Sequence, residues 1–93
     1  MPLQITAIRL QGGPTHRHIS RLQWRREPGG ETGDSPREEI VHWLERCTTN
    51  LAFAHADDTE TTVTVVHPAE GPPYLRTVDD RTWRDDLLRL PRF

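Results

Sequence analysis

The sequence predicts one small α+β domain over residues 1–93, in which an antiparallel sheet of about five strands carries one main helix on one face. Two strand-like segments precede a single amphipathic helix, and three more follow it before a short final helix. With 93 residues, of which 33% are apolar, the chain has room for one modest core. These observations predict the order β-β-α-β-β-β-α.

Two strands joined by a turn are expected at the start of the chain. Residues 3–10 carry apolar side chains on both faces, which fits a strand covered on both sides or one bent by a bulge. Residues 18–26 alternate, with Leu22 and Trp24 on one face and polar residues on the other. Because only a short segment containing Gly12-Gly13-Pro14 separates them, we predict a hairpin.

The best-supported element is a helix from Ser35 to Cys47, after a glycine-rich loop over residues 27–34. Ser35 can cap this helix, Pro36 fits its first position, and Glu38 completes a capping box. We expect its apolar stripe to pack on the sheet, with Cys47 as a small buried residue rather than a nucleophile. The stripe consists of Ile40, Val41, Trp43, Leu44 and Cys47.

Three further strands and a short helix are expected after the main helix. The strands are residues 51–56, 60–67 and 74–78, and the helix that follows is capped by Thr82 and Asp85 and runs to Leu88. The predicted core combines apolar side chains of the main helix and of three strands. Its members are Leu22, Trp24, Ile40, Trp43, Leu44, Phe53, Val63 and Val65.

Charge and cysteine content argue against several classes of protein. All 12 basic residues are arginine and the net charge is −2, whereas nucleic-acid binders are usually basic. Residues 1–27 carry five Arg against one Glu, and residues 28–60 carry two Arg against eight acidic residues. A single cysteine excludes an intramolecular disulfide framework, and no apolar stretch approaches the roughly 20 residues of a membrane span. We therefore expect a cytoplasmic protein that does not bind membranes.

No residue pattern in the chain predicts catalysis or a cofactor, so we expect neither an enzyme nor a cofactor. His16 and His18 could point the same way on a strand and bridge a zinc ion. The candidates for further ligands have no spacing that demands convergence, so we predict no metal site; they are His42, His55, His67 and Cys47. Turn formation and helix capping explain the adjacent carboxylates. These are Asp57-Asp58, Asp79-Asp80 and Asp85-Asp86.

The outward face of residues 18–26 is the first candidate binding surface. Arg21 and Arg25 lie on that face, and Arg17 comes just before it. Cations interleaved with aromatic residues are typical of proteins that bind single-stranded nucleic acid, but Trp24 alternates to the other face. A solvated arginine face is therefore the favoured interpretation, and binding of nucleic acid or another anionic ligand is the alternative.

The last third of the chain contains two runs, Pro73-Tyr74-Leu75-Arg76-Thr77-Val78-Asp79-Asp80 and Asp86-Leu87-Leu88-Arg89-Leu90-Pro91. These runs resemble the closing signature of a family of small bacterial and phage proteins, domain of unknown function 3892. The resemblance extends to the opening strand, to Gly12-Gly13, to His18-Ile19 and to the helix start at Ser35, so it spans nearly the whole chain. Asp86 stands where the family more often has Asn. The family has no established activity, so the resemblance implies none.

Within that signature, the second set of candidate binding residues is Tyr74, Arg76, Thr77 and Asp80. Tyr74 and Arg76 share the less buried face of their strand. Arg76 can pair with Asp79 and Asp80 at the turn or offer its guanidinium to an anionic partner, and we predict the former. Together these patterns predict a non-enzymatic module that binds another protein or self-associates. An arginine-mediated binder of nucleic acid or another anionic ligand is the alternative.

Overall fold

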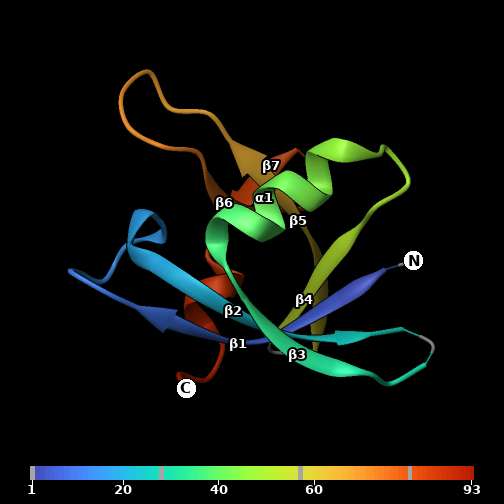
Figure 1. Ribbon diagram of the computed structural model, residues 1–93. Coiled ribbons are helices and arrows are strands. Elements are labelled where there is room, and N and C mark those ends of the chain that lie inside the picture. The colour runs from blue at the N-terminus through green and yellow to red at the C-terminus, as the bar shows by residue number, and fades with distance from the viewer. Residues whose placement is uncertain (1, 28, 57, 80) are drawn as a thin grey trace.

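The computed structural model describes residues 2–27, 29–56, 58–79 and 81–93, and within them it shows seven strands, one α-helix and two short 3-10 helices (Figure 1). The strands are β1 (Leu3–Leu10), β2 (Ile19–Arg26), β3 (Thr32–Pro36), β4 (Ala52–Ala56), β5 (Thr59–Val66), β6 (Tyr74–Asp79) and β7 (Thr82–Arg84). The helices are α1 (Arg37–Arg46), η1 (His16–His18) and η2 (Asp86–Arg89). No helix in these ranges is long and apolar enough to cross a membrane.

The described strands form one mixed sheet in the order β3-β2-β1-β4-β5-β6-β7. Neighbouring strands are antiparallel except β1 and β4, which pair in parallel through residues 3–5 and 52–54. The mixed α and β composition is confirmed, but the prediction of about five antiparallel strands is wrong. Since α1 carries the chain from the edge strand β3 back across the sheet, β4 enters beside β1 in the same direction.

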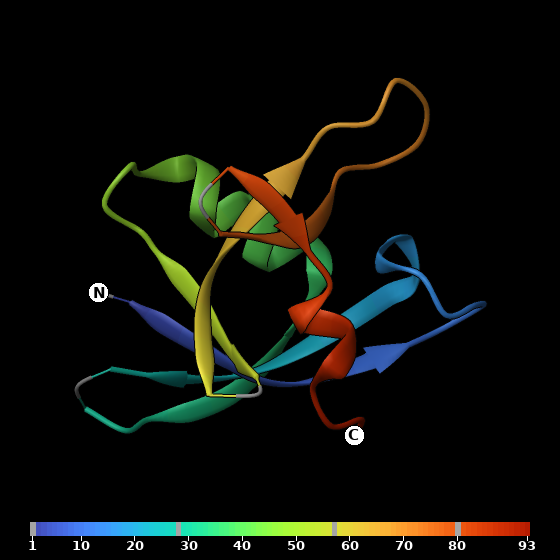
Figure 2. The same cartoon turned by 180° about the vertical axis from the view of Figure 1, so that it is seen from behind.

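The sheet curls around one interior, and α1 and η2 lie at opposite ends of it (Figures 1 and 2). The helix α1 contacts β2, β3, β5 and β6, whereas η2 contacts β1, β4 and β6. Most strands and both of these helices therefore contribute to a single core. Its buried members include Leu3, Ile5, Ile8, Ile19, Leu22, Ile40, Val41, Ala52, Ala54, Val63, Leu75, Leu87 and Leu90.

A bulge in β1 explains why apolar residues occupy both faces of its sequence. The pairing of β1 with β2 shifts register between Ile5 and Ala7, so that the consecutive residues Ala7 and Ile8 are both buried. The predicted hairpin of these two strands is confirmed. Of the two interpretations of residues 3–10, the bulge is therefore the one that the structure shows.

The main helix begins later than its capping pattern predicts. Ser35 pairs with Leu22 as part of β3, and its Oγ accepts a hydrogen bond from Trp24 Nε1 at 3.1 Å. Pro36 becomes the N-cap residue and α1 starts at Arg37. The predictions of a Ser35 cap and of a loop running to residue 34 are therefore wrong, because pairing with β2 takes these polar residues into an edge strand.

The predicted final helix is also wrong over its first half. Residues 82–84 pair with residues 77–79 as the strand β7, and only residues 86–89 form the short helix η2. Asp86 is 1% exposed and accepts a hydrogen bond from Thr61 Oγ1 at 2.9 Å. Burial of this carboxylate against β5 holds the segment close to the sheet, which the local capping pattern does not anticipate.

The predicted core is confirmed in part. Leu22, Ile40 and Val63 are buried, and four further predicted members pack partly buried against them, namely Trp24, Trp43, Leu44 and Val65. Phe53 is only half-buried, because Ala52 and Ala54 face the interior and Phe53 alternates to the other side of β4. Cys47 is exposed rather than buried, because α1 ends at Arg46 and the chain leaves the helix at this residue.

Candidate functional site

The first group of side chains that combines arginine with an aromatic ring lies where η1, β6 and β7 meet. We call it the arginine junction: His16, Arg17, Tyr74, Arg76 and Asp85. Arg76 Nη2 donates to Asp85 Oδ1 at 3.0 Å, and Arg76 Nε donates to the carbonyl of Arg84 at 3.3 Å. The prediction that Arg76 pairs with Asp79 is wrong, because the described cation that pairs with Asp79 is Arg84, at 3.9 Å. The other predicted partner, Asp80, lies outside the described residues.

The junction brings together Arg17 and Tyr74, which belong to the two separate candidate binding surfaces predicted from the sequence. The guanidinium carbon of Arg17 lies 5.4 Å from the centre of the Tyr74 ring, and its Nη1 donates to the carbonyl of Glu70 at 3.4 Å. Thr77 points the other way, into the core, where its Oγ1 donates to the carbonyl of Arg84 at 3.1 Å. These contacts hold η1 and β7 against β6.

His16 is the buried titratable group of the junction. Its Nε2 is 3.9 Å from Asp85 Oδ1, too far for a hydrogen bond, and has no hydrogen-bond partner among the described residues. Burial lowers the pKa of His16, the nearby Arg76 charge lowers it further, and Asp85 opposes both. The neutral ring is therefore the favoured form at neutral pH.

His18 has a separate structural role. Its Nδ1 accepts a hydrogen bond from the Thr15 N–H at 3.2 Å, and a Cβ added at Gly13 would lie 2.5 Å from the His18 ring. Because His16 and His18 lie on a 3-10 helix and not on a strand, side chains two positions apart diverge. In the described part of the chain, no group of three or more His, Cys, Asp and Glu residues could hold a metal ion.

The remaining sequence candidates, Arg21 and Arg25, lie away from the junction. Arg21 Nε donates to Asp34 Oδ1 of β3 at 3.1 Å. Arg25 Nε donates to Glu27 at 2.8 Å, and its Nη2 donates to Gln4 at 3.1 Å. A neighbouring carboxylate therefore already balances each of these charges, which weakens the outward face of β2 as an anion-binding surface.

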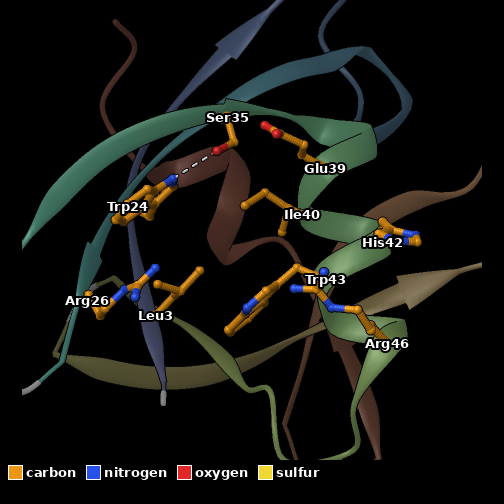
Figure 3. Close-up of a pocket in the computed structure, with 9 residues that line it drawn as sticks. All are labelled: Leu3, Trp24, Arg26, Ser35, Glu39, Ile40, His42, Trp43 and Arg46. Carbon is orange, nitrogen blue, oxygen red and sulfur yellow. Dashed lines mark hydrogen bonds between the residues drawn. The ribbon is translucent and has the colours of Figure 1, made fainter.

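The second group lines a cleft of about 230 Å³ between α1 and the strands β2 and β3 (Figure 3). We call it the tryptophan cleft: Trp24, Arg26, Trp43 and Arg46. Figure 3 shows Trp24 and Arg26 on the strand side and Trp43 and Arg46 on the helix side. The other lining residues are Leu3, Ser35, Glu39, Ile40 and His42.

Local structure places each Trp beside an Arg. Trp24 and Arg26 are two apart on a strand and so share a face, and the Arg26 guanidinium carbon lies 5.7 Å from the centre of the Trp24 ring. Trp43 and Arg46 are three apart on α1 and so lie on neighbouring turns. This Trp-to-Arg spacing, two on a strand and three on a helix, is the sequence signal that could have indicated the cleft.

The strand side of the cleft is held rigidly. Gly33 lies opposite Trp24 in the β2–β3 pairing, and a Cβ added there would come within 2.6 Å of the Trp24 ring. Ser35 Oγ accepts the Trp24 indole N–H, so the ring is fixed both across its face and at its polar edge. The indole is therefore oriented before any partner arrives.

The two arginines of the cleft differ from Arg21, Arg25 and Arg76, each of which pairs with a carboxylate. Among the described residues, neither Arg26 nor Arg46 forms an ion pair with a carboxylate. Arg46 is exposed at the end of α1, and Arg26 is half-buried beside Trp24. The cleft therefore offers two flat apolar walls and two cations with unused hydrogen-bond donors.

The exposed Cys47 follows Arg46 but does not line the cleft. Its thiol lies 3.0 Å from Thr49 Oγ1, and this side-chain hydrogen bond is the main cause that lowers the pKa of Cys47. Nothing in the described part of the chain places a histidine base beside it.

The fold and the cleft together define a small α+β protein with a curled mixed sheet and a cation-lined aromatic cleft. The chain belongs to the family described as protein of unknown function (DUF3892), whose model matches residues 4–91. This confirms the resemblance seen in the sequence. No curated protein and no solved structure is significantly similar to the chain.

The residues that carried the resemblance are largely those that build the fold. Gly13 leaves room for the His18 ring, and Ile19 is fully buried. Leu87 and Leu90 are also buried in the core. The family signature therefore marks the architecture more clearly than it marks a binding site.

Proposed function

We propose that the protein is a non-enzymatic binding module that holds a segment of another protein in the tryptophan cleft. The main support is that two tryptophan rings and two arginines line the same cleft, and that neither arginine has a carboxylate partner among the described residues. Trp and Arg are the side chains most enriched at the energetic centres of protein interfaces. A cytoplasmic location is part of the proposal, and the single cysteine supports it.

The size of the cleft favours one side chain of a partner over a whole small molecule. Its volume is about 230 Å³. Sites for cofactors and drug-sized ligands begin at roughly 300 Å³. A single large side chain from a protein partner therefore matches the space better than a nucleotide or a cofactor does.

The non-enzymatic assignment has separate support. Among the described residues, the two with shifted pKa values, His16 and Cys47, are distant in sequence and neither lines the cleft. Nucleic-acid binding is the less supported alternative, since the net charge is −2 and the outward arginines of β2 pair with Asp34 and Glu27.

A displayed library of random peptides, selected on the folded protein, tests the proposal. We expect enriched peptides to shift backbone and indole NMR signals of Trp24 and Trp43, and to lose binding to a Trp43→Ala variant. A Trp83→Ala variant is the matched control, because Trp83 is 50% exposed on β7 and lies outside the cleft. Peptides that bind elsewhere, no enrichment, or binding of single-stranded RNA that weakens steeply with salt would contradict it.

A further inference from the structure

We infer that the partner segment is acidic, with one aromatic side chain that enters the tryptophan cleft and neighbouring carboxylates that bind Arg26 and Arg46. This inference rests on the proposed function and specifies the chemistry of the partner. The distribution of charged residues and of apolar surface over the cleft supports this inference.

Charge is distributed unevenly around the cleft. Glu39 lies near Ser35 at one end, whereas Arg26 and Arg46 lie toward the other end (Figure 3). His42 lies on the side of α1 away from Trp24. The end with the two arginines is therefore electropositive, and a partner carboxylate is favoured there over a cation.

The walls of the cleft favour an aromatic ring. Leu3 and Ile40 are buried, and the two half-buried indoles complete an apolar surface. An aromatic ring can meet an indole in offset or edge-to-face geometry, which contributes beyond the area it buries. Each arginine beside that ring can then form two parallel hydrogen bonds to one carboxylate, the geometry that its planar guanidinium favours.

A second copy of the chain fits this site poorly. The most exposed aromatic residue in the described ranges is Trp83, at 50% exposure. The described carboxylates near it in sequence are already paired within the chain, since Arg84 lies 3.9 Å from Asp79 and 3.5 Å from Asp86, and Arg76 lies 3.0 Å from Asp85. A second copy's Trp83 segment therefore has no unpaired carboxylate among its described residues to offer Arg26 and Arg46, so charge complementarity favours a separate acidic partner over self-association.

Four short synthetic peptides test the inference by fluorescence polarisation. They share one length and carry Asp-Phe-Glu, Asn-Phe-Gln, Asp-Ala-Glu or Lys-Phe-Lys at the centre. We expect the first to bind best and the amide peptide to bind about tenfold more weakly, as the loss of a charge-assisted hydrogen bond predicts. The alanine peptide should lose binding further, and the lysine peptide should not bind.

Variants of the protein test whether Arg26 and Arg46 cause the preference for the acidic peptide over the amide peptide. Arg26→Gln and Arg46→Gln should each reduce the difference between the acidic and the amide peptide, whereas Arg81→Gln should leave it unchanged. Arg46→Glu should shift the preference toward the lysine peptide. This is a gain of binding that unfolding cannot produce.

The outcomes separate the inference from the proposed function. If all phenylalanine peptides bind in the cleft equally well, or the basic one binds best, the acidic partner is wrong and the protein-binding module stands. If none of the peptides binds and the displayed library also selects nothing at the cleft, both are wrong.

Discussion

The arginine junction and the tryptophan cleft are built from similar residues but differ in how their charges are balanced. In the junction, Arg76 binds Asp85 and the Arg84 carbonyl, and Arg17 lies over Tyr74 and binds the Glu70 carbonyl. In the cleft, Arg26 and Arg46 have no carboxylate partner in the described part of the chain. An arginine beside an aromatic ring therefore indicates a binding site only when its hydrogen-bond donors are unused.

The two regions also differ in the elements that form them. The junction joins the two strands of the β6–β7 hairpin to η1, which is distant from them in the sequence. The cleft lies between the helix α1 and the strands β2 and β3, where a space remains that no side chain of the described chain fills. Four tests of this contrast follow, in order of decreasing expected effect.

Gly33→Ala should have the largest effect, because it forces a methyl group to within 2.6 Å of the Trp24 ring. We expect a loss of about 1–3 kcal/mol in the free energy of unfolding, as overpacking produces. Gly29→Ala is the control, since a Cβ there would meet nothing within 4 Å. Urea unfolding measures both, and equal stabilities would show that the strand side of the cleft is not held rigidly.

Thr77→Val tests whether the junction stabilises the fold. The change removes the buried hydroxyl that donates to the Arg84 carbonyl at 3.1 Å, and should cost about 1 kcal/mol. Thr62→Val on β5 is the matched control for Thr77→Val, because Thr62 is half-buried and donates no side-chain hydrogen bond to a described residue. If chemical denaturation finds the two variants equally stable, the hydroxyl does not hold β7 against β6.

Arg76→Gln and Arg26→Gln compare a paired arginine with an unpaired one. The Arg76–Asp85 pair is 31% and 62% exposed, so its loss should lower the free energy of unfolding by no more than about 1 kcal/mol. Arg26→Gln should change it by less than about 0.5 kcal/mol. Thermal unfolding measures both variants. A larger loss for Arg26→Gln would mean that this residue stabilises the fold and is not reserved for a partner.

The smallest expected effect is the contribution of His16 to the pH dependence of the free energy of unfolding. Burial and Arg76 hold its pKa below the ordinary value of about 6.5, so the unfolded chain binds the proton more tightly. The free energy of unfolding should therefore fall as pH decreases from about 6.5 to the lowered pKa, and His16 should contribute no slope above that window. His16→Gln should remove this part of the slope.

Variants of its neighbours sharpen the pH prediction. Arg76→Gln should raise the pKa of His16 in the folded protein, and Asp85→Asn should lower it further. NMR titration of the His16 ring measures both shifts. An unchanged pKa in both variants would show that these charges do not reach the ring.

Much of the architecture could be predicted from local pattern. Alternation and turn composition located β1, β2, β5 and β6 and the β1–β2 hairpin, and the helical stripe located α1. Strong periodicity works there because each of these elements buries one face, so the apolar spacing reports the secondary structure directly. Local pattern also separated Leu75 and Thr77, which are buried, from Tyr74 and Arg76, which are not fully buried.

The candidate site was harder to predict, since it depends on which charges meet. The spacing of Arg21 and Arg25 indicates an outward basic face, but Asp34 and Glu27 reach them only once β3 has paired and the chain has turned. Arg26 and Arg46 are 20 positions apart in the printed sequence and become neighbours of one cleft only when α1 lies beside β2.

The sequence by itself determined the helix, most of the strands, the α+β composition and the family, because these follow from periodicity and from residues that build turns and core. Only the tertiary structure decided the edge strands β3 and β7, the parallel pairing of β1 with β4, and the burial of Asp86. It also decided which arginines keep unused donors. These features depend on contacts between distant segments, and the free energy of such contacts is not encoded in any local pattern.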